Sequence, residues 1–229
     1  MATVTLDKPQ VLRARTNGFP VPKRPPFISV AEYLKRERAA VEKSEYVDGE
    51  MRKLFGASFE HTVITNNLGS EFYIALKQRR ECRTCSSNIR IHVPATSRFR
   101  YPDVAVVCAP SPVFYPDEHN DILLNPFVIV EVLSPSTEAE DRGDKFGDYQ
   151  LLESLAEYVL VSQHAPRIEV YSRDSGGDWK YHNFVGLSET ARLPRLGISL
   201  ALNDVYDKIE FPDQGVREND EVENSDETA

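Results

Sequence analysis

Two short runs of apolar residues, 104–108 and 128–133, are the clearest structural signal in the chain. Both are rich in valine and have prolines within two residues of each end, a pattern that predicts buried strands. Pro102 lies where a strand can begin, because a proline at that point removes no ladder hydrogen bond. Three further strands and a last apolar segment complete the predicted core: 157–161, 167–171, 179–184 and 193–202.

Helical periodicity appears upstream of these strands. Ser29 followed by Glu32 forms a capping box, and the helix that it begins is expected to end near Lys43. Ser58 can cap a second helix. The apolar face predicted for this second helix consists of Val63, Ile64, Asn67, Leu68, Phe72, Ile74, Ala75 and Leu76.

Turn signals connect the predicted elements. Asp48 and Gly49 lie between two alternating segments and predict a hairpin over 45–54. Residues 87–93 alternate like a half-buried strand and are expected to pair with the strand that follows Asp103. The proline-rich stretch 109–125 is predicted to be a loop, to which the sequence assigns no chemistry. This order of elements allows an α/β fold with a mixed central sheet and helices on its faces.

Each of the two apolar runs carries a carboxylate. Asp103 opens the first run, and Glu131 interrupts the second, where burying a charge is costly. A divalent cation shared by the two side chains would compensate that cost, since Mg²⁺ is bound by one or two carboxylates together with waters. Adjacent backbone carbonyls, Val132 among them, could complete the ligand shell.

A third helix follows Pro135, and Ser136 or Thr137 can cap it. Lys145 lies on this helix in register with three other residues, so that it can project back toward both strand ends. A lysine ammonium beside a metal-bound phosphate can hold the attacking water and stabilise charge at phosphorus. The register partners of the lysine are Asp141, Tyr149 and Leu152.

Asp103, Glu131 and Lys145 each also have an ordinary structural interpretation. Asp103 could cap a turn after Pro102. Glu131 could be a purely structural charge, although a buried carboxylate in an apolar strand carries a desolvation cost. Lys145 could be a surface lysine, because lysines are almost never fully buried.

Several separate motifs, in this order, resemble the Uma-two family of restriction-endonuclease-like domains in the PD-(D/E)XK nuclease superfamily. The similarity extends from about Ser29 to Tyr206. It rests on Lys43-Ser44-Glu45-Tyr46-Val47-Asp48-Gly49-Glu50, Ser58 to His61, Tyr101-Pro102-Asp103-Val104, Val130-Glu131-Val132-Leu133-Ser134-Pro135-Ser136-Thr137, Asp141-Arg142-Gly143-Asp144-Lys145-Phe146, Glu157-Tyr158-Val159-Leu160-Val161 and Trp179.

The resemblance implies a restriction-endonuclease-like α/β fold and a DNA endonuclease that uses Mg²⁺, with Mn²⁺ possible. Asp103 and Glu131 would be the metal ligands, and Lys145 would orient or activate the attacking water. The superfamily lysine expected two residues after the glutamate is absent, because Leu133 holds that place, so Lys145 must substitute from the helix. A homodimer is expected, as in many relatives, since two symmetric subunits can cut both strands of a duplex.

The resemblance also implies accessory roles for Glu45 and His61. Glu45 matches a family position near the metal and could hold water or a second metal, whereas the alternative is an exposed carboxylate. His61 matches the family's histidine and could contact a metal or the scissile phosphate. A lone histidine is more often a packed or surface residue.

The length of 229 residues suits one large domain. We expect a flexible arm over 1–26, the nuclease-like domain over 27–211 and a disordered acidic tail over 212–229. No apolar run approaches the roughly 20 residues that span a bilayer, and no secretory signal begins the chain, so a cytoplasmic location is expected.

The three cysteines, Cys82, Cys85 and Cys108, do not make a disulfide framework and fit a reducing compartment. Cys82 and Cys85 form a Cys-x-x-Cys pair. A zinc site would need two more ligands, and neither a second cysteine pair nor paired histidines are present nearby.

The formal net charge is −9, and the segment 213–229 alone contributes −6 of it, which leaves −3 for the rest. Binding to DNA would therefore depend on a local basic patch and a metal. The candidate DNA-binding residues are Arg79, Arg80, Arg83, Arg98 and Arg100, accompanied by Lys77 and Arg90. The alternative is a solvated helix end and loop.

Two other classes of function are alternatives to an endonuclease. A catalytically silent DNA-binding or assembly module could retain the same fold, because fold alone does not fix function. A serine hydrolase using Ser134 or Ser136 is disfavoured, because the Gly-x-Ser-x-Gly turn is absent.

Overall fold

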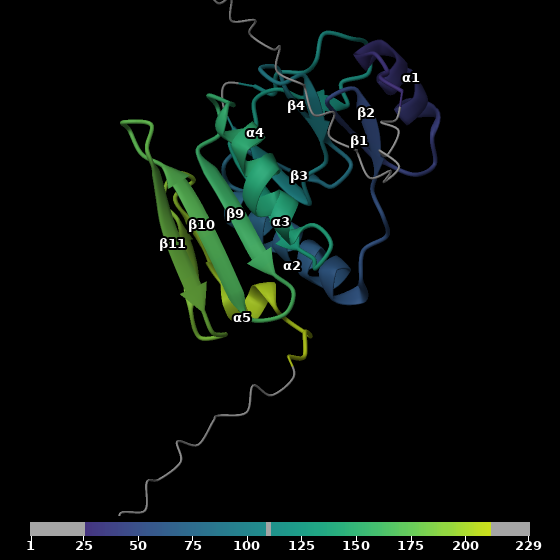
Figure 1. Ribbon diagram of the computed structural model, residues 1–229. Helices are drawn as coiled ribbons and strands as arrows, with labels where there is room; N and C mark the ends of the chain where they lie inside the picture. Colours follow the sequence, from purple (N-terminus) through teal and green to yellow (C-terminus); the bar gives the residue numbers. More distant parts are fainter. Residues whose placement is uncertain (1–25, 109–110, 212–229) are drawn as a thin grey trace, which may run out of the picture.

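The computed structural model describes residues 26–108 and 111–211. The predicted acidic tail lies outside this part of the chain, as does the predicted N-terminal arm apart from Pro26. The described residues form an α/β fold built on a six-stranded sheet, a five-stranded sheet and a small two-stranded sheet. In Figure 1 the strands β9, β10 and β11 form the left part of the molecule, and α1 lies at the upper right with β1, β2 and β4.

The six-stranded sheet has the order β11-β10-β9-β8-β6-β3 and is mixed. Only β8 and β9 run parallel among its pairs in the described ranges. Its strands are β3 (Arg83–Ser86), β6 (Val104–Val107), β8 (Val128–Leu133), β9 (Glu157–Ser162), β10 (Arg167–Arg173) and β11 (Trp179–Val185). The two apolar runs of the sequence are therefore adjacent buried strands, β6 and β8, as predicted.

Alternating residues of β6 and β8 pack on opposite faces of this sheet. Val104, Val106, Val130 and Val132 join the cluster that includes the buried side chains of α2 (Phe59–Leu76), and we call this side the α2 face. The other face, the α4 face, buries Ala105, Val107, Ile129 and Leu133 with Tyr149 of α4 (Phe146–Gln150). Both faces are covered, which explains why these strands are apolar throughout.

The five-stranded sheet has the order β2-β1-β5-β4-β7 and lies with α1 (Val30–Ala39) in the N-terminal half of the fold. Its strands are β1 (Ser44–Val47), β2 (Glu50–Lys53), β4 (Arg90–Val93), β5 (Arg98–Arg100) and β7 (Ile122–Leu123). Asp48 and Gly49 both have positive φ, +52° and +85°, so the predicted hairpin turn is confirmed.

The last elements are β12 (Thr190–Leu193), β13 (Ile198–Ala201) and α5 (Leu202–Val205). β12 and β13 form the two-stranded sheet. Their apolar side chains join the cluster on the α2 face, which confirms that this segment completes the core.

The first two predicted helix caps are confirmed. Ser29 accepts a hydrogen bond from the Glu32 N–H, and Ser58 accepts one from the His61 N–H. α1 ends at Ala39, earlier than expected. α2 buries Ile64, Leu68, Phe72 and Leu76, a strict stripe of every fourth residue, and leaves Ile74 and Ala75 exposed, although the sequence had placed both on the apolar face.

The third helix is interrupted by a π-helical turn. α3 (Glu138–Glu140) continues into the π-helical turn η1 (Asp141–Lys145) and then α4. Thr137 is the N-cap residue, but its side chain makes no capping hydrogen bond. Leu152 follows α4 and is buried. Such turns add a residue within a helix and are frequent at functional sites.

The predicted pairing of residues 87–93 with the strand after Asp103 is wrong. The strand in this segment, β4, pairs with β5 and β7 in the smaller sheet. β6 pairs instead with β3, a strand that the sequence did not predict. β3 contains three polar residues, Arg83, Thr84 and Ser86, and only one apolar residue, and polar composition at a sheet edge hides a strand from pattern analysis.

The expectation that all three cysteines are thiols is wrong for two of them. Cys82 and Cys108 form a disulfide, and Cys85 is free. β3 and β6 are antiparallel with Arg83 opposite Val107, so the residues one step outward face each other. The Cys82 sulfur is therefore not free for a Cys-x-x-Cys zinc site, and the composition argument for a reducing compartment loses two of its three cysteines.

Arg100 connects the smaller sheet to the helices over the larger one. Its side chain is fully buried at the end of β5. The guanidinium donates to Glu45 Oε2 at 2.8 Å, to Glu140 Oε1 at 2.6 Å and to Asp148 Oδ2 at 2.9 Å. These carboxylates come from β1, α3 and α4, so one cation joins three elements.

We expect Arg100→Met to lower the free energy of unfolding by about 3–5 kcal/mol, because it leaves three buried or half-buried carboxylates without their cation. Urea unfolding at neutral pH measures this. Arg192→Met, on an exposed position of β12, should change stability by less than about 0.5 kcal/mol. Equal effects of the two variants would contradict the network.

His92 gives the smaller sheet a pH dependence. Its ring stacks on Phe99 with centroids 4.3 Å apart, and its Nδ1 is buried without a hydrogen-bond partner. Burial lowers the pKa of His92 to about 4. The unfolded chain binds this proton below about pH 6.5, so stability is lost as the pH falls from about 6.5 toward 4.

His92→Phe should therefore reduce the loss of stability between pH 7.5 and pH 5 by roughly 1 kcal/mol, after allowing for solvent near a half-buried ring. Urea unfolding at both pH values measures the difference. His182→Phe, on an exposed position of β11, is the control and should keep the wild-type pH dependence. A His92→Phe curve parallel to that of the wild type would refute the assignment.

Candidate active site

Asp103 lies at the start of β6, where the pairing of β6 with β8 ends. The last pair in this ladder is Val104 with Val130. Beyond it, Asp103 Oδ2 accepts a hydrogen bond from the Val132 N–H at 2.7 Å. The carboxylate thus takes the place of a ladder hydrogen bond and is fixed across the end of the neighbouring strand. It does not cap a turn after Pro102.

His61 holds the other oxygen of this carboxylate. Its Nε2 lies 3.0 Å from Asp103 Oδ1, and the capping of α2 by Ser58 fixes the turn that carries the ring. Burial lowers the pKa of His61, but the hydrogen bond and charge of Asp103 outweigh that effect and raise it above its usual value. His61 is therefore a partner of Asp103, and the interpretation of a lone surface histidine does not apply.

Glu131 is buried on β8 and points to the α4 face. Its Oε1 accepts hydrogen bonds from Lys145 Nζ at 3.3 Å and from the Tyr149 hydroxyl at 3.2 Å. Burial raises the pKa of Glu131 well above its usual value, against the charge of Lys145 and with the help of Asp141. Because its neighbours do not fully compensate the charge, a carboxyl group in this position favours binding either a proton or a cation.

Lys145 is the centre of the buried cluster. Its Nζ lies 3.0 Å from Asp141 Oδ1, 3.3 Å from Glu131 Oε1 and 3.6 Å from Glu45 Oε1. Burial lowers the pKa of Lys145, but these three carboxylates raise it well above its usual value. The side chain is therefore a buried ammonium, and the alternative of a surface lysine is excluded.

Glu45 is also buried, so the alternative of an exposed carboxylate is excluded. Its Oε1 accepts from the Tyr101 N–H at 3.0 Å, and its Oε2 accepts from Arg100 at 2.8 Å. Glu45 therefore connects two buried cations, Arg100 and Lys145.

Asp141 and Tyr149 belong to the cluster, although no chemical role was predicted for them. Burial raises the pKa of Asp141 even though Lys145 is adjacent. Each of them is four residues from Lys145, and this spacing is the signal that could have identified them. The π-helical turn changes the register locally, and Asp141, Lys145 and Tyr149 are nevertheless all buried together.

The predicted DNA-binding arginines separate into two groups. Arg98 and Arg100 are committed to ion pairs, Arg98 with Asp48 and Asp148, and Arg90 is likewise buried against Asp121. Their partners already neutralise them, and their role as DNA contacts stays a prediction. The other basic residues lie around the end of α2 and β3: Lys77, Arg79, Arg80 and Arg83.

The donor chemistry of the site suits a hard divalent cation. Asp103 and Glu131 supply carboxylate oxygens, and Mg²⁺ commonly uses one or two protein carboxylates with waters. The raised pKa of Glu131 marks negative charge that its neighbours leave uncompensated. Within 26–108 and 111–211, no group of three or more His, Cys, Asp or Glu side chains is arranged to hold a metal ion. The ligand roles of Asp103, Glu131 and the Val132 carbonyl therefore stay predictions.

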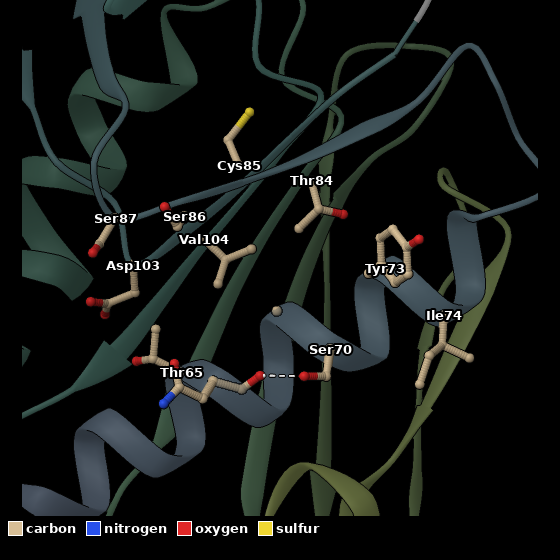
Figure 2. Close-up of a pocket in the computed structure, with 12 residues that line it drawn as sticks. Thr65, Ser70, Tyr73, Ile74, Thr84, Cys85, Ser86, Ser87, Asp103 and Val104 are labelled. Atoms are coloured by element: carbon tan, nitrogen blue, oxygen red, sulfur yellow. Dashed lines mark hydrogen bonds between the residues drawn. The ribbon is translucent and has the colours of Figure 1, made fainter.

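A pocket of about 530 Å³ begins at Asp103. Figure 2 shows Asp103 at one end, α2 along one side with Thr65, Ser70 and Tyr73, and Thr84 to Ser86 of β3 along the other. Asp103 is thus accessible from the α2 face, whereas Glu131 and Lys145 approach it from the α4 face. The carboxylate of Asp103 lies where the two environments meet.

No helix in the described part of the chain is long and apolar enough to cross a membrane.

Two uncharacterized Synechocystis proteins are similar to the chain. One is 35% identical over 198 residues, which cover 86% of this chain and 99% of that protein, and the other is 35% identical over 160 residues, which cover 70% and 89%.

A crystal structure described as "a putative nuclease belonging to DUF820" from Anabaena variabilis has the same fold. Its TM-score is 0.62 at 19% identity, and the match covers 78% of this chain and 97% of that one. Residues 30–203 match the family described as "Uma2: Putative restriction endonuclease". This match covers most of the domain and confirms the resemblance found in the sequence motifs, so the chain belongs to the Uma2 family.

Proposed function

We propose that the protein is a Mg²⁺-dependent DNA endonuclease that hydrolyses phosphodiester bonds at Asp103. The observation that supports this most directly is the position of Lys145, a buried ammonium 3.3 Å from Glu131 and held by two further carboxylates. Burying this many charges is costly, and a purely structural role would be served as well by apolar residues. The family name and the nuclease neighbour point to the same chemistry.

In this proposal Asp103 and Glu131 hold Mg²⁺, or Mn²⁺ in its place, with the Val132 carbonyl as a further ligand. The bound ion would supply Lewis-acid stabilisation of the charge that develops on the phosphate oxygens. His61 and the Val132 N–H each occupy one oxygen of Asp103. A carboxylate has about four lone-pair sites, so both oxygens keep capacity for another partner.

Lys145 orients the attacking water by donating an N–H hydrogen bond. Its raised pKa keeps it an ammonium, so it stabilises developing negative charge and does not remove the water's proton. Glu45 and Asp141 position Lys145 through their ion pairs, and Tyr149 positions Glu131 through its hydroxyl. These three residues act through others and do not touch the substrate.

DNA as substrate, a cytoplasmic location and a homodimer belong to this proposal. A single site cuts one strand, and a symmetric pair of subunits is the simplest way to cut both. The chain's negative charge makes DNA binding depend on local cations.

We expect nicking of supercoiled plasmid at low salt with Mg²⁺ or Mn²⁺, and none with EDTA. Asp103→Asn, Glu131→Gln and Lys145→Ala should each slow nicking by about 100-fold or more, because each removes a group that acts on the transition state. Glu189→Gln and Lys208→Ala, at exposed positions, are matched controls and should nick at the wild-type rate.

Three outcomes are distinguishable in this experiment. Metal-dependent nicking that is lost only in the site variants supports the proposal. Nicking that survives Asp103→Asn would show that the site is wrong or the activity a contaminant. A wild type that shifts DNA in a gel and never nicks it would favour a catalytically silent module. If Lys145→Ala fails to fold, Lys145→Arg is tested in its place, because it keeps the buried positive charge.

A further inference from the structure

The pocket that begins at Asp103 continues along α2 and β3 into a second one. The second pocket has a volume of about 390 Å³ and shares Tyr73 and Thr84 with the first. Together they form a groove, which we call the α2/β3 groove, from Asp103 to the C-terminal end of α2. Figure 2 shows its first part, with Asp103 and Tyr73 at opposite ends.

The far end of the groove is basic. Lys77, Arg79, Arg80 and Arg83 line the second pocket. Arg79 donates to the carbonyls of Leu196 and Gly197. For Lys77, Arg80 and Arg83, no ion pair or side-chain hydrogen bond occurs within the described ranges, so their charges remain available to a ligand.

An exposed aromatic ring lies between Asp103 and these cations. Tyr73 is 66% exposed, and its neighbour Ile74 is 53% exposed. Both contribute to the first pocket. An unstacked ring beside free cations is the combination by which proteins bind single-stranded nucleic acid, because bases stack on the ring while the cations follow the phosphates.

The dimensions of the groove favour a single strand over a duplex. Pockets of about 530 and 390 Å³ are of the size that holds one small ligand each, whereas a protein that reads duplex DNA presents an element to a groove about 12 Å wide. From Thr65 to Lys77, α2 rises by roughly 18 Å, long enough for the backbone of a short single-stranded segment to run along it.

We propose that the α2/β3 groove binds a single-stranded segment of DNA that leads away from the scissile phosphate. Tyr73 stacks on a base, and Lys77, Arg80 and Arg83 bind the phosphates beyond it. The preferred substrate class is then DNA with a single-stranded flap, gap or end next to the cleavage point. This inference rests on the proposed function for the location of the cut, but the binding itself does not require catalysis.

The test is fluorescence anisotropy in EDTA with labelled (dT)12 and with a 12-base-pair duplex. Tyr73→Ala should weaken binding of (dT)12 by at least about fivefold, the effect of losing one stacked base, and Tyr73→Phe should keep wild-type affinity. The double variant Arg80→Ala/Arg83→Ala should weaken binding and reduce the salt slope by about 1.4, since each phosphate contact on a single strand contributes about 0.7.

Lys35→Ala/Lys208→Ala removes two exposed charges elsewhere and should leave the salt slope unchanged. The proposal fails if Tyr73→Ala binds (dT)12 as the wild type does, or if it weakens duplex binding equally. A protein that binds (dT)12 through Tyr73 but never nicks any DNA would overturn the proposed function and leave this groove intact. Metal-dependent nicking together with unchanged binding of (dT)12 by Tyr73→Ala would support the proposed function and overturn the groove proposal.

Discussion

The structure depends on a cluster of buried carboxylates whose charge Lys145 and Arg100 offset. Glu45, Glu131 and Asp141 surround Lys145, and Glu45 is shared with Arg100. Charges of this kind are removed from water at a cost of several kcal/mol each, and they are tolerated only where their partners are close and fixed. The helix carrying Lys145, the hairpin carrying Glu45 and the strand carrying Glu131 therefore have to meet at one point. The raised pKa values of Glu131 and Asp141 show that the compensation is incomplete.

The buried cluster also explains why the sequence pattern predicts some of its members and not others. An acidic residue inside an apolar strand, Glu131, signals a compensating partner by itself, because its cost is local to the strand. The spacing of Lys145 along a helix predicted the direction of its side chain. Arg100 could not be identified in this way, because an arginine in an alternating segment is typical of a surface strand. Its three carboxylates come from positions 40 to 55 residues away in sequence.

The same limit applies to the fold. Strong apolar periodicity predicted β6, β8, β9 and β10, because burial on both faces leaves its mark on every residue. The apolar pattern of a strand does not determine which strand it pairs with. β4 follows the pattern of a strand, yet nothing within it distinguishes pairing with β5 from pairing with β6. The sequence pattern predicts neither the polar edge strand β3 nor the Cys82–Cys108 disulfide, because both depend on the register between β3 and β6.

Asp103 lies between two different environments on the two faces of the larger sheet. On the α4 face, the charges of Glu131 and Lys145 are buried and shielded from solvent. From the α2 face comes an open groove with exposed Tyr73 and free cations. Asp103 therefore lines the groove on the α2 face, while Lys145 and Glu131 are paired behind the strand ends. Because the chain is acidic as a whole, any attraction of a polyanion has to be local, and Lys77, Arg80 and Arg83 make the far end of this groove basic.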